Sequence, residues 1–129
     1  MPKAKPLISV VDDDEAMREA VKGLMKSLGY RVEATASAEE FLGSRHVRRT
    51  SCLIADVQMP GITGFELYQR LSASGKPIPT ILITAYPDDS VRERALAAGV
   101  IGYLSKPFDE NDLLACIRSA LTNARGGGR

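Results

Sequence analysis

Acidic, amine and hydroxyl side chains occur in this sequence directly after short apolar runs. Three consecutive aspartates begin at Asp12, and Asp56 follows the run CLIA. Thr84 ends a further apolar run, and Lys106 stands two residues after the last one. Carboxylates that crowd together raise one another's pKa values, and a hard divalent cation relieves their repulsion. If these residues meet in the fold, they suit phosphoryl transfer, which needs mainly positioning and charge neutralisation.

The expected metal is Mg²⁺, because the candidate ligands are all oxygen atoms. Asp12 and Asp13 are predicted to hold it, directly or through water, beside Asp56. The main-chain carbonyl of Gln58 is the predicted additional ligand, since magnesium prefers octahedral oxygen geometry. The remaining coordination positions can then accept phosphate oxygens.

Asp56 is the predicted nucleophile, because a carboxylate that attacks phosphorus forms an acyl phosphate. Lys106 is predicted to neutralise a second phosphoryl oxygen, and Thr84 to donate its hydroxyl to a third. Each of these residues alone also suits an ordinary structural role, and Asp14 is assigned to one, the N-cap of the first helix. Their joint position after four of the expected strands favours chemistry.

The chain alternates short apolar runs with amphipathic stretches, which predicts strands alternating with helices. The expected strands cover residues 7–11, 30–34, 52–55, 78–84 and 101–104. The expected helices cover about residues 15–28, 37–42, 67–74, 88–98 and 109–121, and a capping box at 37–40 opens the second. This order predicts an α/β fold with a doubly wound parallel sheet. Such sheets bind ligands at the carboxyl ends of their strands, where the candidate residues stand.

The length of 129 residues suits one domain of ordinary globular composition. With 17 Lys and Arg against 16 Asp and Glu, the net charge of +1 argues against a nucleic-acid-binding arm. No apolar run approaches the roughly 18 residues of a membrane span, and the N-terminus does not read as a signal peptide. The protein is therefore expected to be cytoplasmic, without membrane or direct nucleic-acid contacts.

Several other residues receive structural interpretations. Cys52 and Cys116 lack metal-type spacing and are expected to be buried free thiols. The basic run at residues 45–49 is expected to be a solvated loop, because it has no interleaved aromatic residues to bind nucleic acid. Within it, His46 is not expected to carry a phosphoryl group, since arginines surround it. Tyr68 lies on the apolar stripe of a helix and is expected in the core.

The motifs around these residues resemble those of the receiver (CheY-like) domains of two-component response regulators. The resemblance covers about residues 6–121. The motifs that carry it are VVDD at residues 10–13, DVQMPG at 56–61, ITA at 83–85 and KPF at 106–108. Within this family, the sequence is most similar to receivers of the nitrogen-fixation-regulator type.

The resemblance implies a flavodoxin-like sheet of five parallel strands in the order 2-1-3-4-5. It implies that Asp56 accepts a phosphoryl group from the histidine of a sensor histidine kinase. It also implies that Asp13, Asp56 and the Gln58 carbonyl hold Mg²⁺, with Asp12 acting through water.

The resemblance further implies a conformational switch. In such domains Thr84 is drawn toward the phosphoryl group, and Tyr103, which matches the switch aromatic of the fifth strand, turns inward. This re-forms the face made by the fourth helix, fifth strand and fifth helix, where phosphorylation-dependent homodimers are expected. The bond between Lys106 and Pro107 is expected to be cis.

Gln58 and Tyr86 stand two residues after Asp56 and Thr84 and are expected to flank the mouth of the site. In receivers such positions tune how fast water hydrolyses the acyl phosphate. The bulky Tyr86 ring is predicted to shield the phosphoryl group and slow its hydrolysis, and a merely solvated ring is the alternative.

The receiver domain is expected to span residues 1–123, with a flexible tail at residues 124–129. Because about eight residues follow the last expected helix, a single-domain regulator or phosphorelay intermediate that acts on a downstream protein is favoured. A DNA-binding regulator that lacks its output domain is one alternative. A phosphatase of the haloacid dehalogenase type is another, although it expects an acid where this chain has Gln58.

Overall fold

The strands form one parallel sheet in the order β2-β1-β3-β4-β5, and the predicted topology is confirmed. The computed structural model describes residues 5–126 of the chain. The strands are β1 Leu7–Val11, β2 Arg31–Thr35, β3 Thr50–Asp56, β4 Thr80–Thr84 and β5 Gly102–Ser105. Since all five run in one direction, their carboxyl ends lie at one edge of the sheet.

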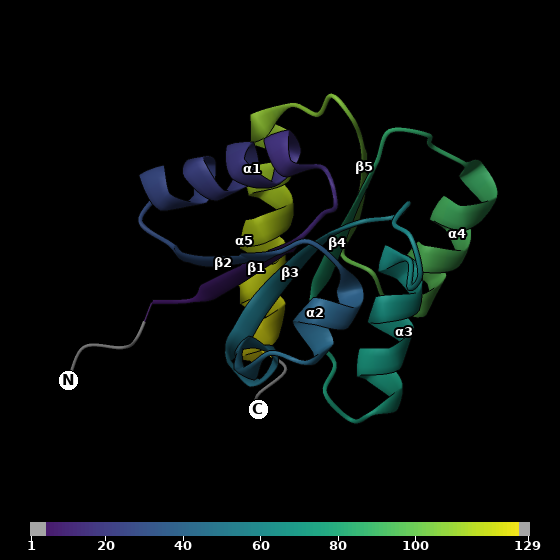
Figure 1. The fold of residues 1–129 in the computed structure, drawn as a ribbon, viewed down its shortest axis with the longest axis horizontal. Helices are drawn as coiled ribbons and strands as arrows, with labels where there is room; N and C mark the ends of the chain where they lie inside the picture. The colour runs from purple at the N-terminus through teal and green to yellow at the C-terminus, as the bar shows by residue number, and fades with distance from the viewer. Residues whose placement is uncertain (1–4, 127–129) are drawn as a thin grey trace.

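Helices connect the strands and cover both faces of the sheet. They are α1 Glu15–Ser27, α2 Ala38–Leu42, α3 Gly64–Ala73, α4 Asp89–Ala98 and α5 Glu110–Gly126. One face carries α1 and α5, and the other carries α2, α3 and α4 (Figure 1). This is the predicted doubly wound α/β fold.

The burial of each strand follows its place in the sheet. Every residue of β1 and of β4 is buried, because helices cover both faces of these strands. Edge strand β2 instead places buried Val32 between exposed Arg31 and Glu33. The predicted edge strand is therefore confirmed, one residue further along the chain than expected.

Side-chain caps determine where two of the helices begin. A carboxylate oxygen of Asp14 accepts the main-chain N–H groups of Ala16 and Met17, as predicted for the cap of α1. A capping box formed by Thr63 and Glu66 opens α3. This second box was not predicted, although its Thr-x-x-Glu pattern is present in the sequence.

The predicted capping box of α2 is only half formed. Ser37 Oγ accepts the N–H of Glu40, as expected. The Glu40 carboxylate, however, accepts the N–H of Ala36 at 2.7 Å and not that of Ser37. The cap is therefore extended by one residue toward β2.

Several expected element boundaries are wrong, and β3 begins two residues and α3 three residues earlier than expected. β4 begins at Thr80 and not at residue 78, because Pro79 has no N–H to donate to a neighbouring strand. The basic run Arg45–Arg49 is a 3-10 helix, η1, in place of the expected loop, and Ser44 Oγ accepts the N–H of His46 at its start. The expected solvation is confirmed for its three arginines, which are exposed, whereas Val47 packs against the core.

The start of α3 lies directly against the end of β3. A Cβ atom built on Gly64 would lie 2.4 Å from the main-chain oxygen of Asp56, so a larger residue does not fit there. The N–H of Gly64 donates to the carbonyl of Val57. On the same helix, Tyr68 is in the core as predicted, and its hydroxyl donates to the carbonyl of Ala98 at 2.9 Å. These contacts fix the loop that follows Asp56.

The two cysteines differ in their burial. Cys52 in β3 is fully buried, and burial raises the pKa of its thiol to about 12. Cys116 is only half-buried, contrary to expectation. It lies beside the apolar stripe of α5, whose buried positions are Leu113, Ile117 and Ala120. Both thiols are free.

The C-terminal helix extends further than the domain boundary predicted at residue 123. α5 is assigned through Gly126, and residues 127–129 of the predicted tail lie outside the described part of the chain. The division at residue 123 therefore stays a prediction. Within residues 5–126, no helix has the length and apolar character needed to cross a membrane.

Candidate functional site

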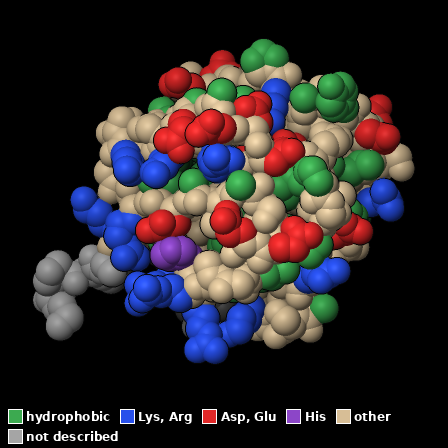
Figure 2. Space-filling model, in the orientation of Figure 1, with side chains coloured by type: hydrophobic (Ala, Val, Ile, Leu, Met, Phe, Trp, Pro, Cys, Tyr) green, Lys and Arg blue, Asp and Glu red, His purple; other side chains and the backbone are tan. Residues whose placement is uncertain are grey.

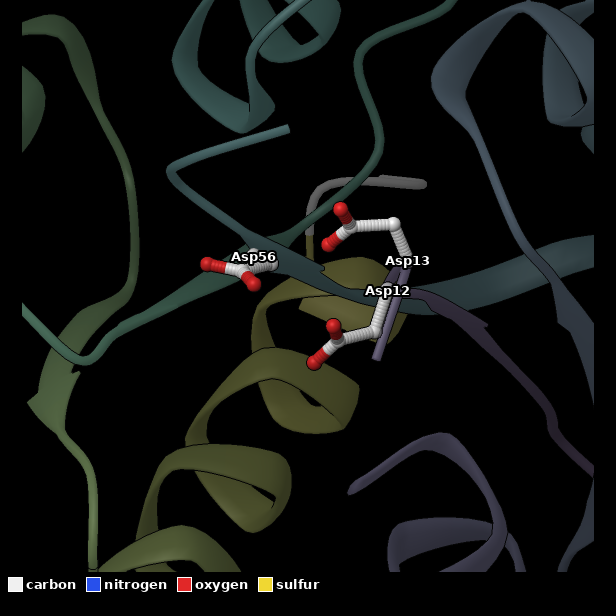
Figure 3. Close-up of side chains that lie close together, drawn as sticks. All are labelled: Asp12, Asp13 and Asp56. Atoms are coloured by element: carbon white, nitrogen blue, oxygen red, sulfur yellow. The ribbon is translucent and has the colours of Figure 1, made fainter. Parts of the chain in front are cut away.

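Three carboxylates meet at the carboxyl ends of β1 and β3. Carboxylate oxygens of Asp12, Asp13 and Asp56 all lie within 4.8 Å of one another (Figure 3). The sheet register produces this proximity, because Val11 pairs with Ala55, the residue before Asp56. The predicted acidic cluster is therefore confirmed in its geometry.

The ammonium group of Lys106 lies between two of these carboxylates. Its Nζ is 3.2 Å from Asp12 Oδ2 and 3.2 Å from Asp56 Oδ2. Lys106 follows β5, and its own N–H donates to the carbonyl of Thr84 at 2.7 Å, which ties the end of β5 to that of β4. The bond between Lys106 and Pro107 is cis, as predicted.

The surroundings of Asp56 disfavour its ionised form. Burial raises its pKa from an ordinary 3.8 to about 6, and the charge of Asp12 contributes to the increase, while Lys106 and the N–H of Gln58 partly oppose it. For Lys106, burial lowers the pKa, but the charges of Asp12 and Asp56 outweigh this and raise it overall. The site is thus a carboxylate cluster whose repulsion one lysine relieves only in part.

The raised pKa of Asp56 predicts how the stability of the metal-free protein depends on pH. The folded protein binds this proton more tightly than the unfolded chain, so lowering the pH from 8 to 5 should increase the free energy of unfolding. Asp56→Asn should remove this dependence and stabilise the protein at pH 8 by on the order of 2 kcal/mol. Urea unfolding with a chelator at several pH values measures both effects. If Asp56→Asn increased the free energy of unfolding equally at pH 5 and pH 8, the prediction would be contradicted.

Two of the carboxylates proposed from the sequence as metal ligands accept main-chain hydrogen bonds. Asp12 Oδ1 accepts the N–H of Asp14 at 2.9 Å, and Asp56 Oδ1 accepts the N–H of Gln58 at 3.1 Å. The guanidinium of Arg18 donates to the carbonyl of Asp12 at 2.7 Å. Because the clustered ligand residues are all aspartates, with no histidine or cysteine among them, they fit a hard cation such as Mg²⁺.

Thr84 is also at this edge, and its hydroxyl is already bonded. The side chain is 0% exposed. Its hydroxyl donates to Gln58 Oε1 and accepts the N–H of Tyr86 at 2.9 Å. The bond to Gln58 was not predicted, because the sequence indicates for this residue only a carbonyl ligand and a place at the mouth of the site. No pattern links the two positions, which are 26 residues apart.

Tyr103 and Tyr86 lie differently with respect to solvent. The half-buried ring of Tyr103 packs against the cluster under α2, α3 and α4, and its hydroxyl accepts the N–H of Asp88, the N-cap of α4, at 3.2 Å. Tyr86 is 75% exposed. The switch role of Tyr103 and the shielding role of Tyr86 therefore remain predictions.

His46 stands apart from the acidic cluster. It belongs to η1, which precedes β3, while Asp56 is the last residue of that strand. Its Nε2 lies 3.6 Å from the carboxylate of Glu33. Figure 2 shows Lys and Arg side chains gathered around the single histidine on the surface. That His46 takes no part in phosphoryl chemistry stays a prediction.

Comparison with known proteins identifies the family. The profile described as "Response regulator receiver domain" matches residues 8–118. The chain belongs to the response regulator receiver family. One receiver relative, the response regulator protein TmoT of Ectopseudomonas mendocina, is 41% identical over 115 residues, which are 89% of this chain and 52% of TmoT. The transcriptional regulatory protein FixJ of Azorhizobium caulinodans is 36% identical over 129 residues, which are 100% of this chain and 61% of FixJ.

Solved structures of similar proteins have the same fold. The response regulator StyR matches with a TM-score of 0.88 and 41% identity over 95% of this chain and 62% of the StyR chain. The structure of FixJ-N matches with a TM-score of 0.82 and 28% identity over 93% of this chain and 96% of its own. The predicted likeness to nitrogen-fixation regulators is confirmed, since FixJ is among the relatives. This receiver chain spans about half the length of curated relatives such as TmoT.

Proposed function

We propose that this receiver accepts a phosphoryl group on Asp56 from the histidine of a sensor histidine kinase. The main observation in favour of this proposal is that three carboxylates lie together at the ends of β1 and β3, where Lys106 bridges Asp12 and Asp56. A buried carboxylate beside an ammonium group and a hydrogen-bond donor is suited to attack phosphorus, because the transferred charge is neutralised in place.

The transfer forms one bond and breaks another. A carboxylate oxygen of Asp56 attacks the phosphorus, and the bond between phosphorus and the donor nitrogen breaks, with its electron pair passing to the imidazole. Lys106 is the proposed partner of one phosphoryl oxygen and the hydroxyl of Thr84 of another. Asp12, Asp13, Asp56 and the carbonyl of Gln58 would hold Mg²⁺, which neutralises phosphoryl charge when bound.

Incubation with acetyl phosphate and Mg²⁺ tests this function. The protein should gain a single phosphoryl group, detected by intact-mass spectrometry, and should need Mg²⁺ to gain it. Continuous turnover of acetyl phosphate without a protein-bound phosphoryl group would favour the phosphatase alternative instead. The presence of Gln58, where such a phosphatase expects an acid, favours the receiver function.

Magnesium should stabilise the protein through Asp13. Ligand binding to the folded state alone raises the free energy of unfolding by about 2.7 kcal/mol at a concentration one hundred times the Kd. Asp13→Asn should lose most of this increase, because the exposed Asp13 carboxylate belongs to the acidic cluster. Thermal unfolding with and without Mg²⁺ measures the effect. Asp14→Asn is the matched control, since Asn caps helices about as well as Asp. Equal Mg²⁺ effects in both variants would contradict the assignment.

The exposed ring of Tyr86 is proposed to shield the acyl phosphate from water. The main-chain N–H of Tyr86 donates to Thr84 Oγ1, so this residue lies next to Thr84. Its ring is exposed. Tyr86→Ala should therefore shorten the half-life of the phosphorylated protein several-fold after the phosphodonor is removed. An unchanged half-life would leave the ring as a merely solvated side chain.

Phosphorylation is proposed to act on partners through the face formed by α4, β5 and α5. The bond between the hydroxyl of Tyr103 and the N–H of Asp88 joins β5 to the start of α4, so a rotation of this ring would alter the face. The proposed targets are a downstream protein or an output domain, and a second copy of this chain in a homodimer. Phosphotransfer rates from candidate kinases would identify the upstream partner.

A further inference from the structure

We infer that the side chain of Gln58 is a positioning residue that competes with the phosphoryl group for the hydroxyl proton of Thr84. The inference rests on the proposed phosphorylation of Asp56 and deepens it. It concerns the side-chain amide of Gln58, whereas the metal assignment concerns only its main-chain carbonyl.

The hydrogen bonds of Thr84 leave its hydroxyl no second proton to give. A threonine hydroxyl has one proton and two acceptor positions. Here the proton is donated to Gln58 Oε1, and one acceptor position takes the N–H of Tyr86. Thr84 can therefore donate to a phosphoryl oxygen only after its bond to Gln58 breaks.

Burial makes this competition direct. Thr84 is 0% exposed with Gln58 bonded to it, so in this arrangement water does not replace the Gln58 oxygen as acceptor of its proton. A buried hydroxyl without an acceptor is costly, because its desolvation is not compensated. The Gln58 bond therefore stabilises the unphosphorylated arrangement, and a phosphoryl oxygen must replace that acceptor for Thr84 to move.

The surroundings of Gln58 allow its side chain to leave. The residue as a whole is exposed, unlike its partner Thr84. It lines a groove of about 690 Å³ between the start of α3 and α4. Other residues that line this groove are Met59, Phe65, Gln69, Val91 and Arg94. The released amide can enter this groove without displacing a core residue.

The main chain of Gln58 couples the competition to the phosphorylation site. The N–H of Gln58 donates to Asp56 Oδ1, while its side chain accepts from Thr84. One residue thus contacts both the proposed phosphoryl acceptor and the proposed switch hydroxyl. Formation of the acyl phosphate would alter the first contact and compete with the second.

Gln58→Met tests the competition, because methionine keeps much of the length of the side chain but has no amide oxygen. The rate of phosphorylation by acetyl phosphate should rise about fivefold, as expected when a hydrogen bond of about 1 kcal/mol no longer stabilises the starting state. Gln69→Met is the matched control, because Gln69 is an exposed glutamine that lines the same groove. Its rate should equal that of the unmodified protein.

Repeating the substitution in a protein that lacks the Thr84 hydroxyl separates the proposed role of Gln58 from a general effect on packing. In the Thr84→Val protein, Gln58→Met should leave the phosphorylation rate unchanged, because no hydroxyl proton remains to be released. The inference would be overturned if Gln58→Met left the phosphorylation rate unchanged in the protein that keeps Thr84. It would also be overturned if Gln58→Met accelerated phosphorylation equally in the Thr84→Val protein.

Urea unfolding of the same variants without metal or phosphodonor provides a readout independent of phosphorylation. The losses of stability from Gln58→Met and Thr84→Val should be less than additive in the double variant, because both substitutions break the same hydrogen bond. Additive losses would overturn the inference. Failure of the unmodified protein to take up any phosphoryl group would overturn the proposed function itself, a result distinct from a phosphorylated protein whose rate is insensitive to Gln58.

Discussion

Asp56→Asn should abolish uptake of a phosphoryl group from acetyl phosphate in the presence of Mg²⁺. The neutral amide lacks the nucleophilic carboxylate, and it also removes one of the three acidic groups of the cluster. Intact-mass spectrometry of the incubated protein should show only the unmodified mass. This is the largest effect we expect from a single substitution.

The neighbouring Asp14→Asn variant provides the control for that experiment. Asp14 caps α1 through the N–H groups of Ala16 and Met17, and Asn can accept the same bonds. This variant should be phosphorylated like the unmodified protein. Phosphorylation of Asp56→Asn, or loss of phosphorylation in both variants, would contradict the assignment of Asp56 as acceptor.

Lys106→Met should slow phosphorylation by about 10²-fold, the loss typical when one group that stabilises transition-state charge is removed. The ammonium group lies 3.2 Å from both Asp12 and Asp56, so a phosphoryl group formed on Asp56 would lie within its reach. Methionine keeps an apolar side chain of similar length but carries no charge. Single-turnover kinetics with acetyl phosphate measure the loss.

Two further lysine variants make the Lys106 result specific. Lys76→Met alters an exposed lysine between α3 and β4, before the amino end of that strand, and should leave the rate unchanged. Lys106→Arg keeps the positive charge and should retain more activity than Lys106→Met. A rate for Lys106→Met within a factor of about two of the unmodified protein would contradict the proposed role, since it corresponds to well under 1 kcal/mol.

The acidic site was predictable because it depends on the main chain. Asp12, Asp56, Thr84 and Lys106 each stand at or just after the end of a strand, and parallel strands bring those ends to one edge. Apolar runs marked the strands, and the stretches between the runs have apolar residues at helical spacing. Strands that alternate with helices indicated a parallel sheet. The strand order came from the resemblance to receivers, since periodicity alone does not determine it.

Contacts between residues on different elements could not be predicted from the sequence. The bond from Thr84 to Gln58 and the bond from Asp88 to Tyr103 join residues on different elements. Each depends on the path of a loop and on the rotamer of a long side chain, neither of which leaves a pattern at fixed spacing. Gln58 was expected to supply a carbonyl ligand and to flank the mouth of the site, but its bond to Thr84 was not predicted.

Local backbone features account for the misplaced boundaries. Pro79 has no N–H to donate to a neighbouring strand, so β4 starts later than its apolar run. The run Arg45–Arg49 has no apolar periodicity, yet a cap by Ser44 is enough for a single short 3-10 helix. Such short elements depend on one or two local hydrogen bonds and not on an amphipathic pattern.

Chemical mapping of the phosphoryl group tests the central claim most directly. Borohydride reduces an aspartyl phosphate to homoserine, which marks the acceptor residue for peptide mass spectrometry. After incubation with acetyl phosphate and Mg²⁺, the peptide that contains Asp56 should carry homoserine at position 56, and peptides with Asp12 or Asp13 should be unchanged. Homoserine at position 12 or 13, or a phosphoryl group on His46 that resists this reduction, would contradict the claim.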